Sequence, residues 1–179
     1  MDPQRFDCVV VGAGPAGLMA AVYLQRYHRR VLVADHGHSR ALAIERSHNF
    51  PGFPAGIEGG ELLALMRRQF ADLQGTVREA EVSELARRPE GGFSARVGGD
   101  PVIARTVFIA TGVVDRVPAL PGMESLQRSG LVRQCPICDG HEYRDRRIAV
   151  LGDGPHAERE VAFIAHYSDR VSWVGVDQA

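Results

Sequence analysis

Two glycine-rich segments, 140 residues apart, are the feature that most constrains how this 179-residue chain can fold. The first reads Gly12-Ala-Gly-Pro-Ala-Gly17 and the second reads Gly152-Asp-Gly-Pro-His-Ala157. Each follows a short apolar, β-branched run and precedes a helical pattern that a proline opens at a favoured position. A strand, a glycine turn and a helix in this order predict a βαβ unit, and the repetition predicts two of them in an α/β protein.

Apolar periodicity and turn residues predict the elements of the first part of the chain. Residues 40–57, which contain Pro51, Gly52 and Pro54, are expected to form a long loop. Helices are predicted from Pro15 to about Tyr27 and over 60–73. Strands are predicted over 6–11, 31–34, 76–82, 93–97 and 102–110.

The second part of the chain repeats the first unit in shortened form. Strands are predicted over 147–151 and 170–174, with a helix over 155–166 between them. The Pro-rich segment 117–122 is the predicted boundary, which divides the chain into domains at 1–117 and 118–179. Because a dinucleotide-binding half needs at least three parallel strands, we expect an incomplete second crevice. We also expect self-association through exposed apolar side chains, namely Val150, Phe163, Ile164 and Trp173.

The first glycine segment is typical of a turn that holds a dinucleotide. Its first glycine allows a tight turn, its second lets the backbone approach a pyrophosphate, and its third lets helix and strand pack closely. The N-terminus of the helix attracts the phosphates. Asp35 follows Gly17 by 18 residues, near the spacing of about 20 expected for an acid that binds ribose hydroxyls.

The second glycine segment fits the same pattern with Ala157 as an accepted third residue. Gly175 stands where the first unit has Asp35. With no carboxylate there to repel a 2′-phosphate, the position permits NADP. For both segments, a structural turn without a ligand is the alternative.

Cys135 and Cys138 stand between the two glycine segments. Two thiols at this spacing can close a small disulfide ring and reopen it through thiolate attack. Asp139 follows at once and can supply a proton to a leaving thiolate. Zinc is the alternative use of such a pair, but tetrahedral zinc needs four ligands, and His141 is the only further ligand near the pair.

Composition bounds the class of protein. The net charge of −1 gives no basic surface for nucleic acid, and no stretch is long and apolar enough to span a bilayer. Three cysteines do not form a secreted disulfide framework, and Cys8, in a Val-rich run, is predicted to be a buried, inert thiol. We therefore expect a cytoplasmic protein with no metal site and with no nucleic-acid or membrane partner.

Together these residues resemble the low-molecular-weight thioredoxin reductase family, which are NAD(P)H- and FAD-dependent pyridine nucleotide-disulfide oxidoreductases. Asn49-Phe-Pro-Gly-Phe53 resembles the family's loop near the flavin ring, and Ala110-Thr111-Gly112 resembles the strand end that contacts FAD. The resemblance covers the whole chain. Family members continue through the rest of the NADPH domain and a returning FAD segment, so we expect the C-terminal part to be lacking.

The resemblance implies a Rossmann-like FAD-binding domain followed by the start of a second, Rossmann-like NAD(P)-binding domain. It also implies that Cys138 faces the flavin, that Cys135 exchanges with the substrate, and that Asp139 is the acid. NADP (or NAD) would be bound through Gly152, Gly154 and Ala157. FAD would be bound through Gly12, Gly14, Pro15, Ala16, Gly17, Asp35, Asn49, Ala110, Thr111 and Gly112.

The implied function is electron transfer from NAD(P)H through FAD to the Cys135–Cys138 disulfide. The electrons would pass on to a thioredoxin-like protein or a small-molecule disulfide, and the complete protein would be a homodimer. Two alternatives stay open, a flavin-dependent disulfide oxidase that uses oxygen and a non-catalytic truncated remnant. For the 179 residues alone we expect weak FAD retention and no NADPH oxidation, because both nucleotide sites would lack one side.

Overall fold

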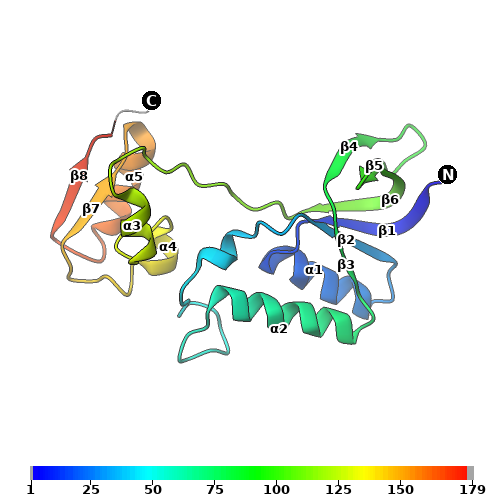
Figure 1. Ribbon diagram of the computed structural model, residues 1–179, viewed down its shortest axis with the longest axis horizontal. Helices are drawn as coiled ribbons and strands as arrows, with labels where there is room; N and C mark the ends of the chain where they lie inside the picture. Colours follow the sequence, from blue (N-terminus) through cyan, green and yellow to red (C-terminus); the bar gives the residue numbers. More distant parts are fainter. Residues whose placement is uncertain (1, 177–179) are drawn as a thin grey trace. The chain divides into compact units, whose positions relative to one another are not determined.

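The computed structural model describes residues 2–176 and has an α/β fold (Figure 1). It divides into two compact units, residues 1–48 with 53–114 and residues 49–52 with 115–179. The first unit carries the first glycine segment, and the second carries the cysteine pair and the second glycine segment.

The first unit is built on one sheet. Its strands are β1 (Gln4–Val11), β2 (Val31–Asp35), β3 (Val77–Glu79), β4 (Val82–Arg87), β5 (Phe93–Val97) and β6 (Asp100–Ile109). They lie in the order β3-β2-β1-β6-β5-β4, in which β3, β2, β1 and β6 are parallel and β5 and β4 are antiparallel additions. Val11 pairs with Ala34 on one side and with Ile109 on the other. The parallel strands therefore end at one edge, where dinucleotide folds bind their ligands.

Two helices, α1 (Pro15–Arg26) and α2 (Gly59–Asp72), pack on one face of the parallel strands. Successive residues of β1 serve opposite faces, as the period of a strand requires. Val10 packs with Leu18 and Phe70 under the helices, and Val9 packs with a second apolar cluster on the other face. The first predicted βαβ unit and both predicted helices are confirmed.

The expected loop over 40–57 contains more structure than predicted. The 3-10 helix η1 (Arg40–Ala43) follows Ser39, whose side chain accepts a hydrogen bond from Ala41 N. An isolated bridge pairs Ser47 with Ile57 through reciprocal backbone hydrogen bonds of 2.8 and 2.9 Å. This bridge holds the two ends of segment 47–57 together.

The expected single strand over 76–82 is wrong, because the chain forms two strands there, at opposite edges of the sheet. Ala80 N donates to Asp35 O after the last β3 pair. The chain then pairs antiparallel with β5 through β4, with an irregularity between Ser83 and Ala86 where Glu84 has φ 51°. Alternation along a sequence cannot show that neighbouring residues pair with different strands, so the pattern predicted one strand.

The second unit contains a parallel pair of strands, β7 (Ile148–Leu151) and β8 (Val171–Val174), with the helix α5 (Gly154–Ile164) packed against them. This arrangement confirms the second predicted βαβ pattern. Two short helices precede it, α3 (Met123–Arg128) and α4 (Pro136–Asp139). Neither was predicted from the sequence.

The expected apolar exposure in the second unit is wrong for two of its four residues. Val150 and Ile164 are only 8% and 7% exposed, because α5 covers its own side of the strand pair. Phe163 is half-buried, and its ring lies edge-on to that of Tyr167. Trp173 alone is largely exposed, at 49%.

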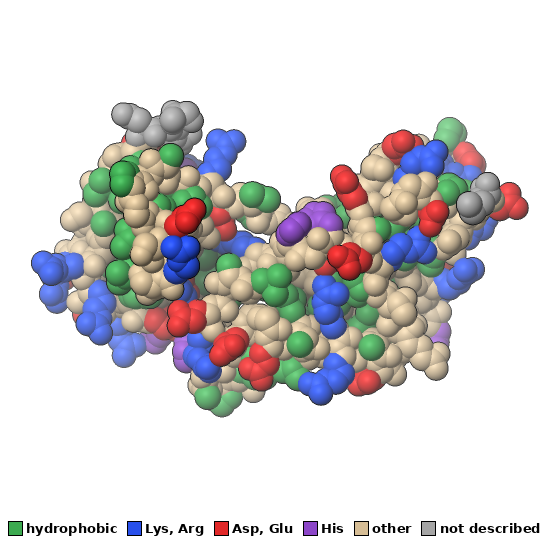
Figure 2. Space-filling view, in the orientation of Figure 1, with side chains coloured by type: hydrophobic (Ala, Val, Ile, Leu, Met, Phe, Trp, Pro, Cys, Tyr) green, Lys and Arg blue, Asp and Glu red, His purple; other side chains and the backbone are tan. Residues whose placement is uncertain are grey.

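The surface agrees with the modest net charge of −1. Acidic and basic side chains are interspersed over the first unit in the view of Figure 2. Within residues 2–176, no helix combines the length and the apolar character that crossing a membrane requires.

Candidate functional site

The first glycine turn joins β1 to α1 in a geometry that only glycine allows. Gly12 has φ +100°, and a Cβ atom there would lie 2.3 Å from Ala110 O. A Cβ atom at Gly17 would lie 1.9 Å from Gly12 O. Gly14 is the N-cap of α1 and Pro15 its first residue, and no side chain caps this helix end. The end of the helix can therefore offer its N–H groups to an anion.

The end of β6 closes this turn from the side. Ala110 N donates to Val11 O at 2.8 Å, and the Ala110 methyl group would lie 3.2 Å from a Cβ atom at Gly17. Thr111 is exposed, and Gly112 has φ +71°. The structure thus brings Ala110 and the backbone of Thr111, two of the three predicted strand-end residues, beside the glycine turn.

Asp35 joins three parts of the first unit. Its Oδ1 accepts from Ala13 N at 3.0 Å, and its Oδ2 accepts from Gly37 N at 3.3 Å and from Arg67 in α2 at 2.8 Å. Its side chain is only 10% exposed. A carboxylate offers about four acceptor positions, and these three bonds use three of them.

Arg67 and Asn49 differ from the other residues considered around the first glycine turn. Arg67 was missed because it lies 32 residues from Asp35, and no local pattern joins them. Asn49 lies in the segment 49–52, which groups with the second unit. Its place beside the flavin stays a prediction.

The cysteine pair forms a disulfide in the second unit. Cys135 and Cys138 are joined at the start of α4, with an S–S distance of 2.02 Å. Cys138 N and Asp139 N both donate to Cys135 O, at 3.0 and 3.2 Å. Ile137 between them is 76% exposed. The helical turn places one apolar, accessible side chain beside the bond.

Asp139 is held by an arginine that sequence reasoning missed. Arg133 Nε donates to Asp139 Oδ2 at 2.8 Å, and its second nitrogen donates to Oδ1 at 3.4 Å. Both side chains are mostly shielded, at 26% and 20% exposure. The arginine lies only six residues before the carboxylate, so the sequence did contain a nearby cation that could have been considered as a partner for Asp139. Hydrogen bonds with both partners charged are among the stronger ones, and this pair fixes the carboxylate beside the cysteines.

The other sulfur and metal candidates lie apart from this chemistry. Cys8 is 3% exposed in β1, which confirms its predicted burial, and this burial raises the pKa of its thiol. Among the described residues, no group of three or more His, Cys, Asp or Glu side chains gathers where it could hold a metal ion.

The second glycine turn is built differently from the first. Gly152 N donates to Val174 O at 3.1 Å, and Gly152 O accepts from the indole Nε1 of Trp173 at 2.7 Å. Gly154 has φ +67° and begins α5, where no side chain caps the helix, and Ala157 is 2% exposed. Trp173 was expected only as an apolar surface residue.

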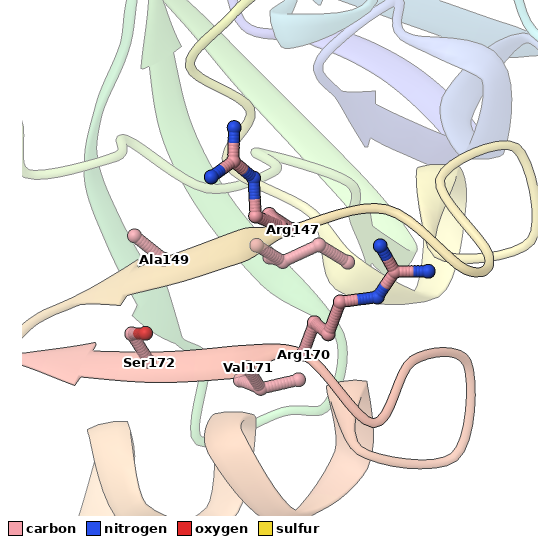
Figure 3. A pocket seen from close by; sticks show the side chains of 6 residues that line it. Arg147, Ala149, Arg170, Val171 and Ser172 are labelled. Atoms are coloured by element: carbon pink, nitrogen blue, oxygen red, sulfur yellow. The ribbon is translucent and has the colours of Figure 1, made fainter.

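A hollow on the strand pair lies away from the second turn (Figure 3). It is lined by both strands near their starts, and Arg147 and Arg170 extend from there, with Ala149 and Ser172 further along. The glycine turn follows the opposite, carboxyl end of β7. Since α/β folds bind nucleotides at the carboxyl ends of strands, the hollow is not the predicted nucleotide site.

Comparison with known proteins matches most of this chain to one family. Residues 6–176 match the family model described as pyridine nucleotide-disulphide oxidoreductase. The thioredoxin reductase of Treponema pallidum (strain Nichols) is 33% identical over 172 residues, which cover 94% of this chain and 55% of that protein. The thioredoxin reductase of Mycolicibacterium smegmatis is 34% identical over 171 residues, with 94% and 54% covered.

Solved structures share the fold of this chain. The crystal structure of HlmI matches with a TM-score of 0.81 at 30% identity, over 94% of this chain and 54% of that one. An atypical thioredoxin reductase, TRi from Desulfovibrio vulgaris Hildenborough, matches at 32% identity with a TM-score of 0.56, over 97% of this chain and 56% of that one. The chain spans about half the length of the curated relatives that it matches.

Proposed function

The chain belongs to the pyridine nucleotide-disulphide oxidoreductase family, and on that premise we propose that it passes electrons from NAD(P)H through FAD to the Cys135–Cys138 disulfide. The dithiol then reduces an external disulfide, on a thioredoxin-like protein or a small molecule. The observation that carries the proposal is the disulfide itself, which the chain places between two glycine turns of nucleotide-binding type.

The first turn fits the pyrophosphate and ribose of FAD. Gly12 and Gly17 leave no room for a Cβ atom because backbone carbonyls of the protein stand there, so they allow the tight turn and the close packing of α1. Gly14, the second glycine, has no side chain to keep a phosphate away from the backbone. The uncapped start of α1 suits the negative charge, and the last acceptor position of Asp35 suits a ribose hydroxyl. When bound, FAD supplies the two-electron chemistry that side chains lack.

The cysteine pair takes up and releases the electrons. Reduction of the Cys135–Cys138 bond consumes two electrons and two protons and leaves two thiols. Attack by the Cys135 thiolate on an external disulfide breaks that S–S bond, releases one substrate thiolate and leaves the other substrate sulfur joined to Cys135 in a mixed disulfide. The Cys138 thiolate then attacks the Cys135 sulfur, which restores the internal bond and releases the second substrate thiolate. Asp139, positioned by Arg133, exchanges protons with the pair.

The second turn receives the reduced nicotinamide nucleotide. The start of α5 faces the turn as α1 does in the first unit, and Ala157 occupies the third position. Gly175 brings no carboxylate of its own, but Asp153 Oδ1 would lie 3.1 Å from a Cβ atom at Gly175, so a carboxylate stands beside this position. We therefore propose no preference between NADPH and NADH.

The roles of the two cysteines can be tested in FAD-loaded protein. In Cys135→Ser the remaining Cys138 thiolate should lie against the oxidised flavin and give a long-wavelength charge-transfer band. Cys138→Ser should show no such band. The reverse pattern would exchange the two roles, and absence of a band in both variants would contradict contact between the pair and the flavin. Peroxide production from a substrate dithiol without NAD(P)H would instead indicate an oxidase.

A further inference from the structure

The two glycine turns align residue for residue, yet they place the carbonyl of their first glycine differently. In the first turn, Gly12 O lies so close to the third glycine that a Cβ atom at Gly17 would be 1.9 Å from it. The matching third residue of the second turn is Ala157, which has a Cβ atom. A carbonyl placed as in the first turn would therefore collide with the methyl group of Ala157.

The second turn avoids that collision by a different backbone. Gly152 has φ +159°, where Gly12 has φ +100°, and Gly154 has φ +67°. Both first glycines keep the same backbone bond to the neighbouring strand, from Gly12 N to Ala34 O at 2.7 Å and from Gly152 N to Val174 O at 3.1 Å. The two turns therefore begin alike and diverge only after this bond.

Trp173 provides the hydrogen-bond donor for the carbonyl of Gly152 in its different orientation. Its indole Nε1 donates to Gly152 O at 2.7 Å. The matching residue of the first unit is Val33, which is fully buried, whereas Trp173 is 49% exposed. A half-exposed ring buries little apolar surface for its size, but its N–H gives the carbonyl the partner that it needs.

From these observations we infer that Ala157 and Trp173 form a coupled pair, in which Trp173 positions the second glycine turn for the nucleotide. Ala157 prevents the inward carbonyl, and the indole holds the outward one. The inference rests on the proposed function for the identity of the ligand. The coupling between Ala157 and Trp173 is a property of the turn and does not depend on that ligand.

The test is a double-mutant cycle on the 179-residue chain. Trp173→Phe removes the N–H and keeps a ring, and Ala157→Gly removes the methyl group that prevents the inward carbonyl. NADPH affinity is measured by the emission of the reduced nicotinamide, and stability by urea unfolding followed by circular dichroism. Both are measured in the wild type, the two single variants and the double variant. Tyr143→Phe is the matched control, because it also removes one side-chain bond to a backbone carbonyl, that of Gly130 at 3.3 Å.

W173F should weaken NADPH binding about fivefold, the scale of one hydrogen bond, and should lower the urea midpoint. In the A157G background the same change should cost less than about twofold, because the carbonyl can turn inward. Since glycine inside a helix is itself destabilising, only differences within one background count.

Equal losses in both backgrounds, or a loss no larger than that of Y143F, would overturn the coupling. If the wild type binds no NADPH, the 179 residues do not form the second nucleotide site on their own, as expected for a crevice with two parallel strands. The unfolding cycle then decides the inference alone, with a larger midpoint loss for W173F in the wild-type background supporting it and equal losses refuting it.

Discussion

At the scale of single residues, the first nucleotide turn depends on the absence of side chains more than on their chemistry. Gly12 and Gly17 face backbone carbonyls at distances that no Cβ atom tolerates. Gly60, by contrast, lies in α2 with nothing within 4 Å of a Cβ atom. The same substitution should therefore have opposite consequences at different glycines.

Gly12→Ala should reduce FAD affinity about 10-fold or more, because alanine is strained at this φ and its methyl group meets Ala110 O. Gly60→Ala should leave FAD affinity unchanged and slightly raise stability. Quenching of flavin fluorescence on binding measures both. Equal affinity of the two variants would show that the turn does not hold the flavin.

Asp139→Asn in FAD-loaded protein should slow exchange between flavin and dithiol by about 10²-fold or more, the usual scale for loss of general acid–base help. The matched control is Glu124→Gln, which breaks the exposed pair with Arg128 at 3.6 Å. Stopped-flow flavin absorbance measures the rate. Wild-type exchange in D139N would make the Arg133–Asp139 pair structural only.

At the scale of elements, Asp35 links the glycine turn, the end of β2 and α2. Asp35→Ala would leave the N–H of the fully buried Ala13 without its acceptor and should lower the free energy of unfolding by about 2 kcal/mol. Arg67→Ala should cost less than about 1 kcal/mol, because the arginine is 40% exposed and its charge is screened. Urea unfolding compares them, and an equal or larger loss in R67A would assign the stabilisation to the ion pair.

The sequence correctly predicted those elements whose local apolar pattern is matched by their packing in the fold. The strand, glycine turn and helix of each unit follow from periodicity and Pro15 or Pro155, and the structure confirms both. The split between β3 and β4 could not be predicted, because pairing partners at opposite sheet edges leave no trace in alternation. The helix that covers Val150 was predicted, but its packing against the strand pair is a tertiary contact that the sequence pattern did not show.

The candidate site divides in the same way. The glycines, Asp35 and the cysteine pair follow from spacing, since each has a stereochemical or redox reason for its residue type. Arg67 and Trp173 act through contacts that only the fold creates. Arginine and tryptophan have many uses, so their presence in the sequence did not indicate these particular partners.

At the scale of the whole molecule, we propose one electron path, which runs from a nicotinamide nucleotide through a flavin to a disulfide. Each unit supplies a nucleotide turn, and the second also supplies the Cys135–Cys138 disulfide. The central claim is that electrons on the flavin reach this disulfide. That claim can be separated from nucleotide specificity and from the identity of the final substrate.

Anaerobic titration of FAD-loaded protein with dithionite tests this claim most directly, because it bypasses the second nucleotide turn. The flavin and the disulfide each take up two electrons, so the wild type should need two equivalents of the two-electron reductant per flavin for full reduction. The double variant C135S/C138S should need one. A requirement of one equivalent in both proteins, with the disulfide still intact by thiol titration, would contradict electron transfer from the flavin to Cys135–Cys138.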